Sequence, residues 1–269
     1  MQRSKQAWFL AWCLAASAQS LAAAGTGATD PQVARGREIA EEADKRNSGW
    51  SDMRADLTMS LKNAYGEQSR RALRLRTLEV PGEGDKSLVV FDEPADVKGA
   101  ALLSHAYVSR ADDQWLYFPA TKRVKRIAST NKSGPFMGAE FAYEDMAPWE
   151  LNKYSYKLTG EKQVQGMDAW VLEMVPQYQD SGYTRQVSML DKAELRPLQT
   201  DYYDRKGALL KTQVFSGYTK YLNRYWRAAK MEMVNHQTQK QTVLTWQNYA
   251  FKSGLGDSEF NKDALLRGQ

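Results

Sequence analysis

Between residues 50 and 249 the sequence alternates between apolar and polar side chains, and short turns separate the alternating segments. Successive side chains of a β-strand point to opposite faces of a sheet, so this period of two predicts strands that bury one face and expose the other. The first segment carries apolar residues at every second position: Ala55, Leu57, Met59 and Leu61. No segment of helical periodicity interrupts the series, which is typical of an antiparallel meander.

The number of alternating segments indicates the architecture. We count about eleven strands, joined by turns such as residues 81–85 and 165–168. An antiparallel sheet of this width curls into a barrel or splits into a sandwich. One helix is expected before the sheet, because Asp30 and Pro31 form a helix start and residues 33–45 carry a modest apolar stripe. The chain is therefore predicted to be mainly β.

The N-terminus has the features of a secretory signal peptide. Arg3 and Lys5 precede an apolar stretch at residues 7–18, and the small residues that end at Ala24 suit signal peptidase. We predict that residues 1–24 are removed by cleavage near Ala24 and that the product is exported to the periplasm.

The exported part, residues 25–269, is predicted to form a single domain, because no repeat, low-complexity segment or linker divides it. Cys13 is the sole cysteine and lies in the signal peptide, so no disulfide is expected. Removal of the signal peptide leaves 35 basic residues against 32 acidic residues, a net charge of +3. This weak basic bias does not favour nucleic-acid binding.

The sequence shows no constellation that would carry catalysis or hold a metal. The G-x-S-x-G elbow of hydrolases is absent, and the exported part has no cysteine nucleophile. His105 and His236 are the two histidines, and neither belongs to an H-E-x-x-H motif or has a ligand partner at close spacing. We therefore predict no catalytic residues, no metal ligands and no cofactor, and we disfavour an enzyme that works through carboxylates or His105.

One short segment is densely basic. Four cationic residues interleave with Val124 and Ile127, and alternation places them on both faces of a strand: Lys122, Arg123, Lys125 and Arg126. Lysines on an exposed edge strand commonly prevent edge-to-edge aggregation, which is one interpretation. The alternative is a patch that contacts anionic phospholipid head groups or an acidic partner.

The longest interruption of the strand pattern, residues 128–149, is unusually apolar. Its large apolar residues are too numerous to remain in water, so the segment should fold over the sheet: Phe136, Met137, Phe141, Tyr143, Met146 and Trp149. Such a loop either fills the interior as ordinary core or forms a lid over a ligand cavity. Methionine and aromatic side chains suit a lid because they repack around different apolar ligands.

Several stretches resemble, in order and spacing, the outer-membrane lipoprotein-sorting-like proteins of the LolA/LolB-like superfamily. The most specific of them is the segment from Phe136 to Met146. The matching stretches are FDEP at 91–94, KG at 98–99, WLYFPA at 115–120, RVKRI at 123–127, FMGAEFAYEDM at 136–146 and FNKDAL at 260–265. The resemblance implies a single strongly curved antiparallel sheet, an unclosed β-barrel, with a helical or loop lid over an apolar concave face.

The resemblance also implies a function. It predicts a non-enzymatic periplasmic carrier that binds the acyl chains of a lipid or lipoprotein, moves them between envelope membranes and contacts those membranes peripherally, with an inner-membrane export complex or transporter as partner. The candidate cavity residues are Leu57, Met59, Leu61, Leu73, Leu75, Val89 and Phe91. Alternation alone does not distinguish a hollow interior from a filled one. The alternative is a non-catalytic envelope interaction module or an accessory subunit of a membrane transporter.

Overall fold

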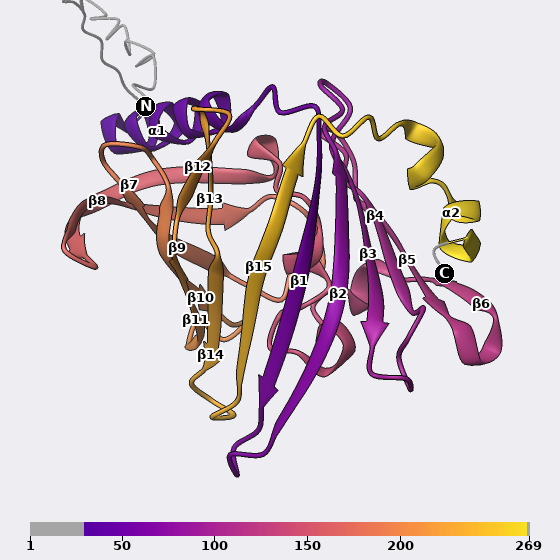
Figure 1. Ribbon diagram of the computed structural model, residues 1–269. Coiled ribbons are helices and arrows are strands. Elements are labelled where there is room, and N and C mark those ends of the chain that lie inside the picture. The colour runs from indigo at the N-terminus through magenta and orange to yellow at the C-terminus, as the bar shows by residue number, and fades with distance from the viewer. Residues whose placement is uncertain (1–29, 268–269) are drawn as a thin grey trace, which may run out of the picture.

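The computed structural model describes residues 30–267, so the predicted signal peptide lies outside the described residues. The described chain is mainly β and is built around one antiparallel sheet of thirteen strands, in the order β6-β5-β4-β3-β2-β1-β15-β14-β11-β10-β9-β8-β7 (Figure 1). A small ribbon pairs the other two strands, β12 and β13. The strands are β1 (Asp52–Lys62), β2 (Gln68–Leu78), β3 (Lys86–Glu93), β4 (Ala101–His105), β5 (Asp113–Phe118), β6 (Arg123–Arg126), β7 (Tyr154–Val164), β8 (Met167–Pro176), β9 (Arg185–Asp191), β10 (Pro197–Tyr203), β11 (Leu209–Ser216), β12 (Thr219–Tyr221), β13 (Tyr225–Arg227), β14 (Lys230–Asn235) and β15 (Gln241–Phe251).

The predicted mainly β, antiparallel and unclosed architecture is confirmed, and only the expected strand count is corrected. The sheet is not a closed barrel, because β6 and β7 are its two edges and do not pair with each other. The count of about eleven strands was too low, since the main sheet alone has thirteen. Strands β12 and β13 are three residues long each, which is too short for alternation to be recognised in the sequence.

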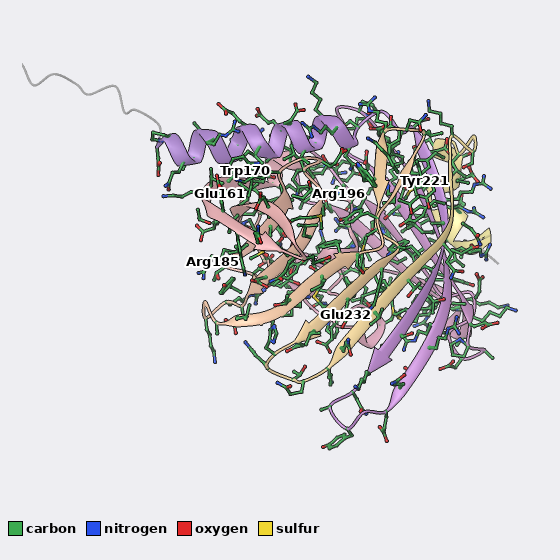
Figure 2. All side chains as sticks on the ribbon, turned by 60° about the vertical axis from the view of Figure 1, so that its left-hand side comes forward. Glu161, Trp170, Arg185, Arg196, Tyr221 and Glu232 are labelled. Carbon is green, nitrogen blue, oxygen red and sulfur yellow. The ribbon has the colours of Figure 1, made fainter. Side chains whose placement is uncertain are left out.

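Helix α1 (Pro31–Asn47) begins where the sequence predicts. The Asp30 carboxylate accepts a hydrogen bond from the Gln32 amide at 2.9 Å, and Pro31 occupies the first turn, where its missing N–H costs nothing. The helix lies across edge strand β7, and Figure 2 shows Trp170 of β8 beneath it. Ile39 packs there against Leu172 and Leu190. Edge strand β7 is thereby covered.

The register of the long strands places their apolar residues on one face. Leu57 of β1 pairs with Leu73 of β2 on one side and with Trp246 of β15 on the other. Leu73 in turn pairs with Phe91 of β3, so a continuous apolar row crosses four strands. The main core cluster forms on this concave face.

The opposite face of β3–β5 has its own cover, formed by the C-terminal segment. There Phe260 and Leu265 pack against Leu88, Leu103 and Trp115. This segment contains α2 (Lys262–Arg267), and the remaining short helices are η1 (Pro119–Thr121), η2 (Ser129–Asn131), η3 (Phe136–Gly138), η4 (Glu144–Met146), η5 (Leu151–Lys153) and η6 (Asp257–Phe260). Within residues 30–267, no helix has both the length and the apolar character needed to cross a membrane.

Candidate functional site

A large cavity lies inside the curve of the sheet, beside the C-terminal half of α1. Its volume is about 1390 Å³, which is above the roughly 300–1,000 Å³ typical of small-molecule pockets. Polar side chains lie along much of its border, whereas a set of apolar side chains from seven strands provides its walls: Leu75, Val89, Leu172, Met174, Leu190, Phe215, Met231 and Leu244.

The seven candidate cavity residues all lie on the concave face, but they do not share one environment. Leu75 and Val89 line the large cavity. Leu61 lines a separate pocket of about 360 Å³ near the β1–β2 turn. The others are fully buried in the core and do not border the large cavity: Leu57, Met59, Leu73 and Phe91.

Sequence reasoning missed most of the cavity wall. Leu172, Leu190 and Met231 belong to strands that also alternate, so the signal was present in the sequence. Alternation identifies the apolar face of a sheet, but it does not show which part of that face is filled by another segment.

The segment that fills the rest of the concave face is the apolar loop, which we call the plug (residues 132–146). Phe136 is fully buried, with its ring centroid 5.7 Å from that of Phe91 and 5.6 Å from that of Tyr143. The Phe136 amide donates to the Phe141 carbonyl oxygen at 2.7 Å, which folds the plug back on itself. Arg71 of β2 donates to the Met137 carbonyl oxygen.

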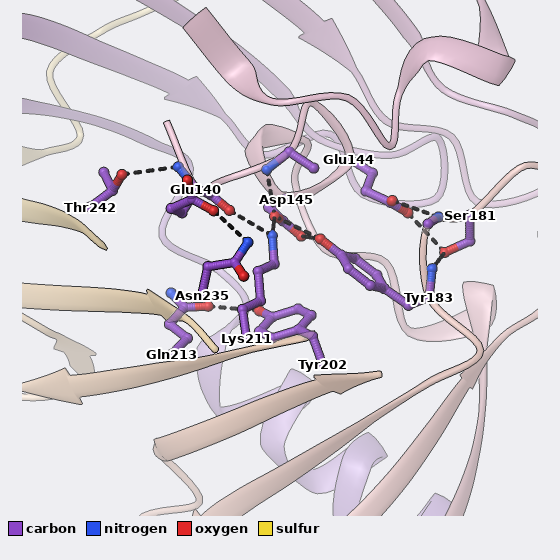
Figure 3. Close-up of polar contacts among 12 residues, drawn as sticks. Glu140, Glu144, Asp145, Ser181, Tyr183, Tyr202, Lys211, Gln213, Asn235 and Thr242 are labelled. Carbon is purple, nitrogen blue, oxygen red and sulfur yellow. Dashed lines mark hydrogen bonds and ion pairs between the residues drawn. The ribbon is translucent and has the colours of Figure 1, made fainter. Parts of the chain in front are cut away.

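A buried ion pair fastens the plug to the sheet (Figure 3). The Lys211 Nζ atom of β11 lies 2.7 Å from Asp145 Oδ2, and both side chains are less than a tenth exposed. Lys211 also donates to the Glu140 carbonyl oxygen at 2.7 Å, and the Tyr183 hydroxyl donates to Asp145 at 2.9 Å. Each charge is therefore paired and hydrogen-bonded, as burial requires.

Further hydrogen bonds hold the neighbouring plug residues. Glu144 accepts from the Gly182 amide at 2.8 Å and from the Ser181 hydroxyl at 2.9 Å, and burial raises the pKa of its carboxyl. Glu140 accepts from Asn235 of β14 at 2.7 Å (Figure 3). The plug is thus tied to strands and connections on the far side of the interior, which is the arrangement of a fixed core element.

The six candidate lid residues divide between two environments. Phe141 and Met146 lie in the plug and also line the cavity, whereas Phe136, Met137 and Tyr143 do not line it. Trp149 lies beyond the plug in a loop, residues 147–153, that borders the cavity, and its side chain is 42% exposed. Its ring packs edge-on against Tyr156 at 6.4 Å. Of the six candidate lid residues, Trp149 is the one whose side chain is exposed.

Carboxylates gather where this loop meets the β2–β3 turn. The Asp85 amide donates to Glu150 at 3.1 Å, and the Asp85 carboxylate accepts from the Val80 amide at 3.0 Å. Burial, reinforced by the negative charge of Glu150, raises the pKa of Asp85 to about 7. Burial also raises the pKa of Glu150. This end of the cavity is acidic.

The basic segment is an edge strand, as one of its two interpretations expects. Strand β6 pairs with β5 on one side and ends the sheet on the other. Lys122, Arg123 and Lys125 are exposed, and Arg126 forms an ion pair with Asp113. The four residues lie away from the cavity.

Each of the two histidines lies at hydrogen-bond distance from another group of the fold. His105 lies 2.5 Å from the Phe260 carbonyl oxygen through Nε2, and burial lowers its pKa. His236 Nε2 lies 2.8 Å from the Thr212 hydroxyl. Among residues 30–267, no group of three or more potential ligands is placed to hold a metal ion.

Comparison with protein families gives one matching family model, described as that of an uncharacterized protein, which covers residues 83–267. Among curated proteins, no sequence matches the chain.

Solved structures give closer matches. An outer membrane lipoprotein-sorting protein domain from Vibrio parahaemolyticus is 52% identical with a TM-score of 0.85, and the match covers 87% of this chain and 99% of that one. A DUF1329 family protein from Desulfovibrio piger is 32% identical with a TM-score of 0.83, over 88% of this chain and 100% of that one. A LolA superfamily protein from Nitrosomonas europaea shares the fold at 21% identity, with a TM-score of 0.69 over 85% of this chain and 98% of that one.

Proposed function

Because this chain belongs to the DUF1329 family of outer-membrane lipoprotein-sorting-like proteins, we propose that it is a periplasmic carrier of acyl chains. It binds the acyl chains of a lipid or lipoprotein in the large cavity and moves them between envelope membranes. The name of the Vibrio relative and the LolA-like fold support this class of function.

The observation that carries the proposal is the open part of the concave face. The plug fills the interior beside β1–β4, yet a cavity of about 1390 Å³ with apolar walls persists between α1 and β8–β11. Burial of an acyl chain contributes about 0.8 kcal/mol per methylene, so an apolar cavity alone supplies a large driving force for binding. A carrier of this kind needs no catalytic residue.

The arrangement of the plug also suggests how a ligand enters and leaves. The plug is held by the buried Lys211–Asp145 pair, so its release is costly. The loop at residues 147–153 also borders the cavity, and its Trp149 side chain is exposed. Exchange with a donor or acceptor membrane therefore proceeds through displacement of this loop.

Native mass spectrometry of the protein purified from its own periplasm without detergent, followed by lipid extraction, tests the proposal. A stoichiometric adduct that carries acyl chains is the expected result. Leu190→Trp should reduce the adduct because the larger side chain fills the cavity, whereas Leu209→Trp, at an exposed position, should leave it unchanged. A protein that carries no lipid and takes up no added phospholipid or lipopeptide contradicts the proposal.

One observation favours a second function, that of an envelope interaction module. The free edge of β6 presents three exposed cations that have no ion pair among the described residues: Lys122, Arg123 and Lys125. A transporter subunit with an acidic surface would fit this edge. Charge reversal at all three positions should then abolish binding to that subunit without altering the lipid content of the protein. If the edge has no such role, the variant should bind the same partners as the wild type.

A further inference from the structure

One end of the cavity carries many cationic side chains. It is formed by the C-terminal end of α1 and the β12–β13 ribbon, and Figure 2 shows Arg196 in the interior beneath α1. Six cationic residues line the cavity at this end: Lys45, Arg46, Arg196, Lys220, Arg224 and Arg227.

Three of the six cations are neutralised by neighbouring carboxylates. Arg46 pairs with Glu42 at 2.8 Å. Arg196 pairs with Asp191 at 2.6 Å, and Lys220 lies 3.6 Å from Glu194.

Arg227 is partly buried and has no such partner. Its Nη1 atom donates to two neutral oxygens, Asn47 Oδ1 at 2.7 Å and the Trp226 carbonyl at 2.9 Å. The guanidinium carbon lies 5.2 Å from the Phe251 ring centroid. Its Nε and Nη2 atoms have no acceptor among residues 30–267. A half-buried guanidinium without an ion-pair partner is a favourable contact for an anion.

Further donors lie at this end. Arg224 Nη2 donates to the Lys45 carbonyl oxygen at 3.2 Å, and neither residue forms an ion pair within the described chain. The indole N–H groups of Trp226 and Trp246 are buried and have no acceptor there, and both residues line the cavity. Buried donors without acceptors are rare in folded proteins.

Two carboxylates lie near these donors, and the negative charge of Glu79 acts on Arg227, but neither forms an ion pair with Arg227, Arg224 or Lys45 among the described residues. Glu79 is occupied by the amides of Gly49 at 2.6 Å and Ser51 at 2.8 Å. Asp44 forms no ion pair among the described residues, and burial raises the pKa of its carboxyl.

We propose that this end of the cavity binds the anionic head group of an acyl lipid, with Arg227 as the central contact and Arg224 and Lys45 at the border. The inference rests on the proposed carrier function and narrows its ligand to lipids with a phosphate or carboxylate head. The acyl chain then extends along the apolar wall formed by Phe215, Met231 and Leu244.

A competition between two lipids tests the inference. The purified full-length protein is incubated with vesicles that contain equal amounts of phosphatidylcholine and phosphatidylglycerol with identical acyl chains. The protein is then separated from the vesicles by flotation, and its bound lipids are quantified by mass spectrometry. We expect at least fivefold enrichment of phosphatidylglycerol in the wild-type protein. In Arg227→Met the two lipids should be bound in nearly equal amounts, while Lys206→Met, which removes an exposed charge that does not line the cavity, should keep the enrichment.

The outcomes separate this inference from the carrier function. Bound lipid in the vesicle ratio, or enrichment retained in Arg227→Met, overturns the anionic site and leaves the carrier intact. No bound lipid of either kind overturns the carrier itself. If Arg227→Met does not fold, as judged by circular dichroism, the double variant Lys45→Met/Arg224→Met at the cavity border should lower the enrichment at least twofold, and an unchanged value counts against the site. A parallel run with oleate in place of phosphatidylglycerol shows whether a carboxylate is also selected.

Discussion

Strands β1–β6 and strands β8–β11 follow the same alternation of apolar and polar residues, yet their concave faces are filled differently. Over the first group the plug packs Phe136 and Phe141 onto the apolar row, and the C-terminal segment covers the other face. Over the second group α1 covers the edge, and a cavity remains between helix and sheet. A sheet's own sequence therefore determines which face is apolar, while segments elsewhere in the chain determine whether that face is filled.

The largest effect should come from breaking the ion pair that holds the plug. Lys211→Met leaves Asp145 buried without a partner, so we expect a loss of about 3–5 kcal/mol in the free energy of unfolding, measured by urea denaturation. The matched control is Lys192→Met, whose pair with Glu161 is on the surface and should contribute less than about 1 kcal/mol.

A double variant sharpens this prediction. Asp145→Asn combined with Lys211→Met removes both charges, so it should be more stable than Lys211→Met alone. Equal losses for the two Lys→Met variants would mean that the plug is held by its apolar contacts instead.

Truncation of one leucine in strands β1–β6 and of one in strands β8–β11 should lower the free energy of unfolding by unequal amounts. Leu73 is fully buried beneath the plug, so Leu73→Ala should cost about 2–5 kcal/mol, including the new void. Leu190 already borders the cavity, so Leu190→Ala should cost roughly 1–2 kcal/mol, mainly for lost apolar burial. Urea titration of both variants measures the difference, and similar losses would argue that the cavity closes in solution.

The acidic end of the cavity should make stability depend on pH. Asp85 has a pKa of about 7 in the folded protein against 3.8 unfolded, so the folded state holds its proton more tightly. The resulting stabilisation is complete below pH 3.8, is lost as pH rises towards 7 and is absent above that value.

Removal of the Asp85 carboxyl should therefore stabilise the folded protein at high pH. Asp85→Asn keeps an acceptor for the Val80 amide and should gain roughly 1–3 kcal/mol over the wild type at pH 8 but almost nothing at pH 4. Thermal melting across this range is the measurement, with exposed Asp96→Asn as the control. A gain that is equal at both pH values would contradict a raised pKa as its cause.

The sequence predicted the elements of the fold more fully than the site. The cap at Asp30, the alternation in β1 and the edge position of β6 are local properties, so they are legible in the residues themselves. The prediction of an unclosed sheet came from a family resemblance, because alternation does not specify whether a sheet closes into a barrel. The cavity wall at Leu190 and the anchoring of Asp145 by Lys211 depend on contacts between distant segments, which no local pattern encodes.

The smallest effect concerns edge strand β7, which α1 covers. Gly36 of α1 lies so close to β7 that an added Cβ would be 2.7 Å from the Leu158 backbone nitrogen, so Gly36→Ala must push the helix away from the strand. The alanine gains up to about 1 kcal/mol in helix propensity but loses more to the clash, for an expected net loss of about 1–2 kcal/mol by urea denaturation. Exposed Gln32→Ala in the same helix should change stability by less than about 0.5 kcal/mol. Because α1 also borders the cavity, Gly36→Ala should speed lipid exchange as well, whereas a variant more stable than the wild type would show that the helix is not held at this distance.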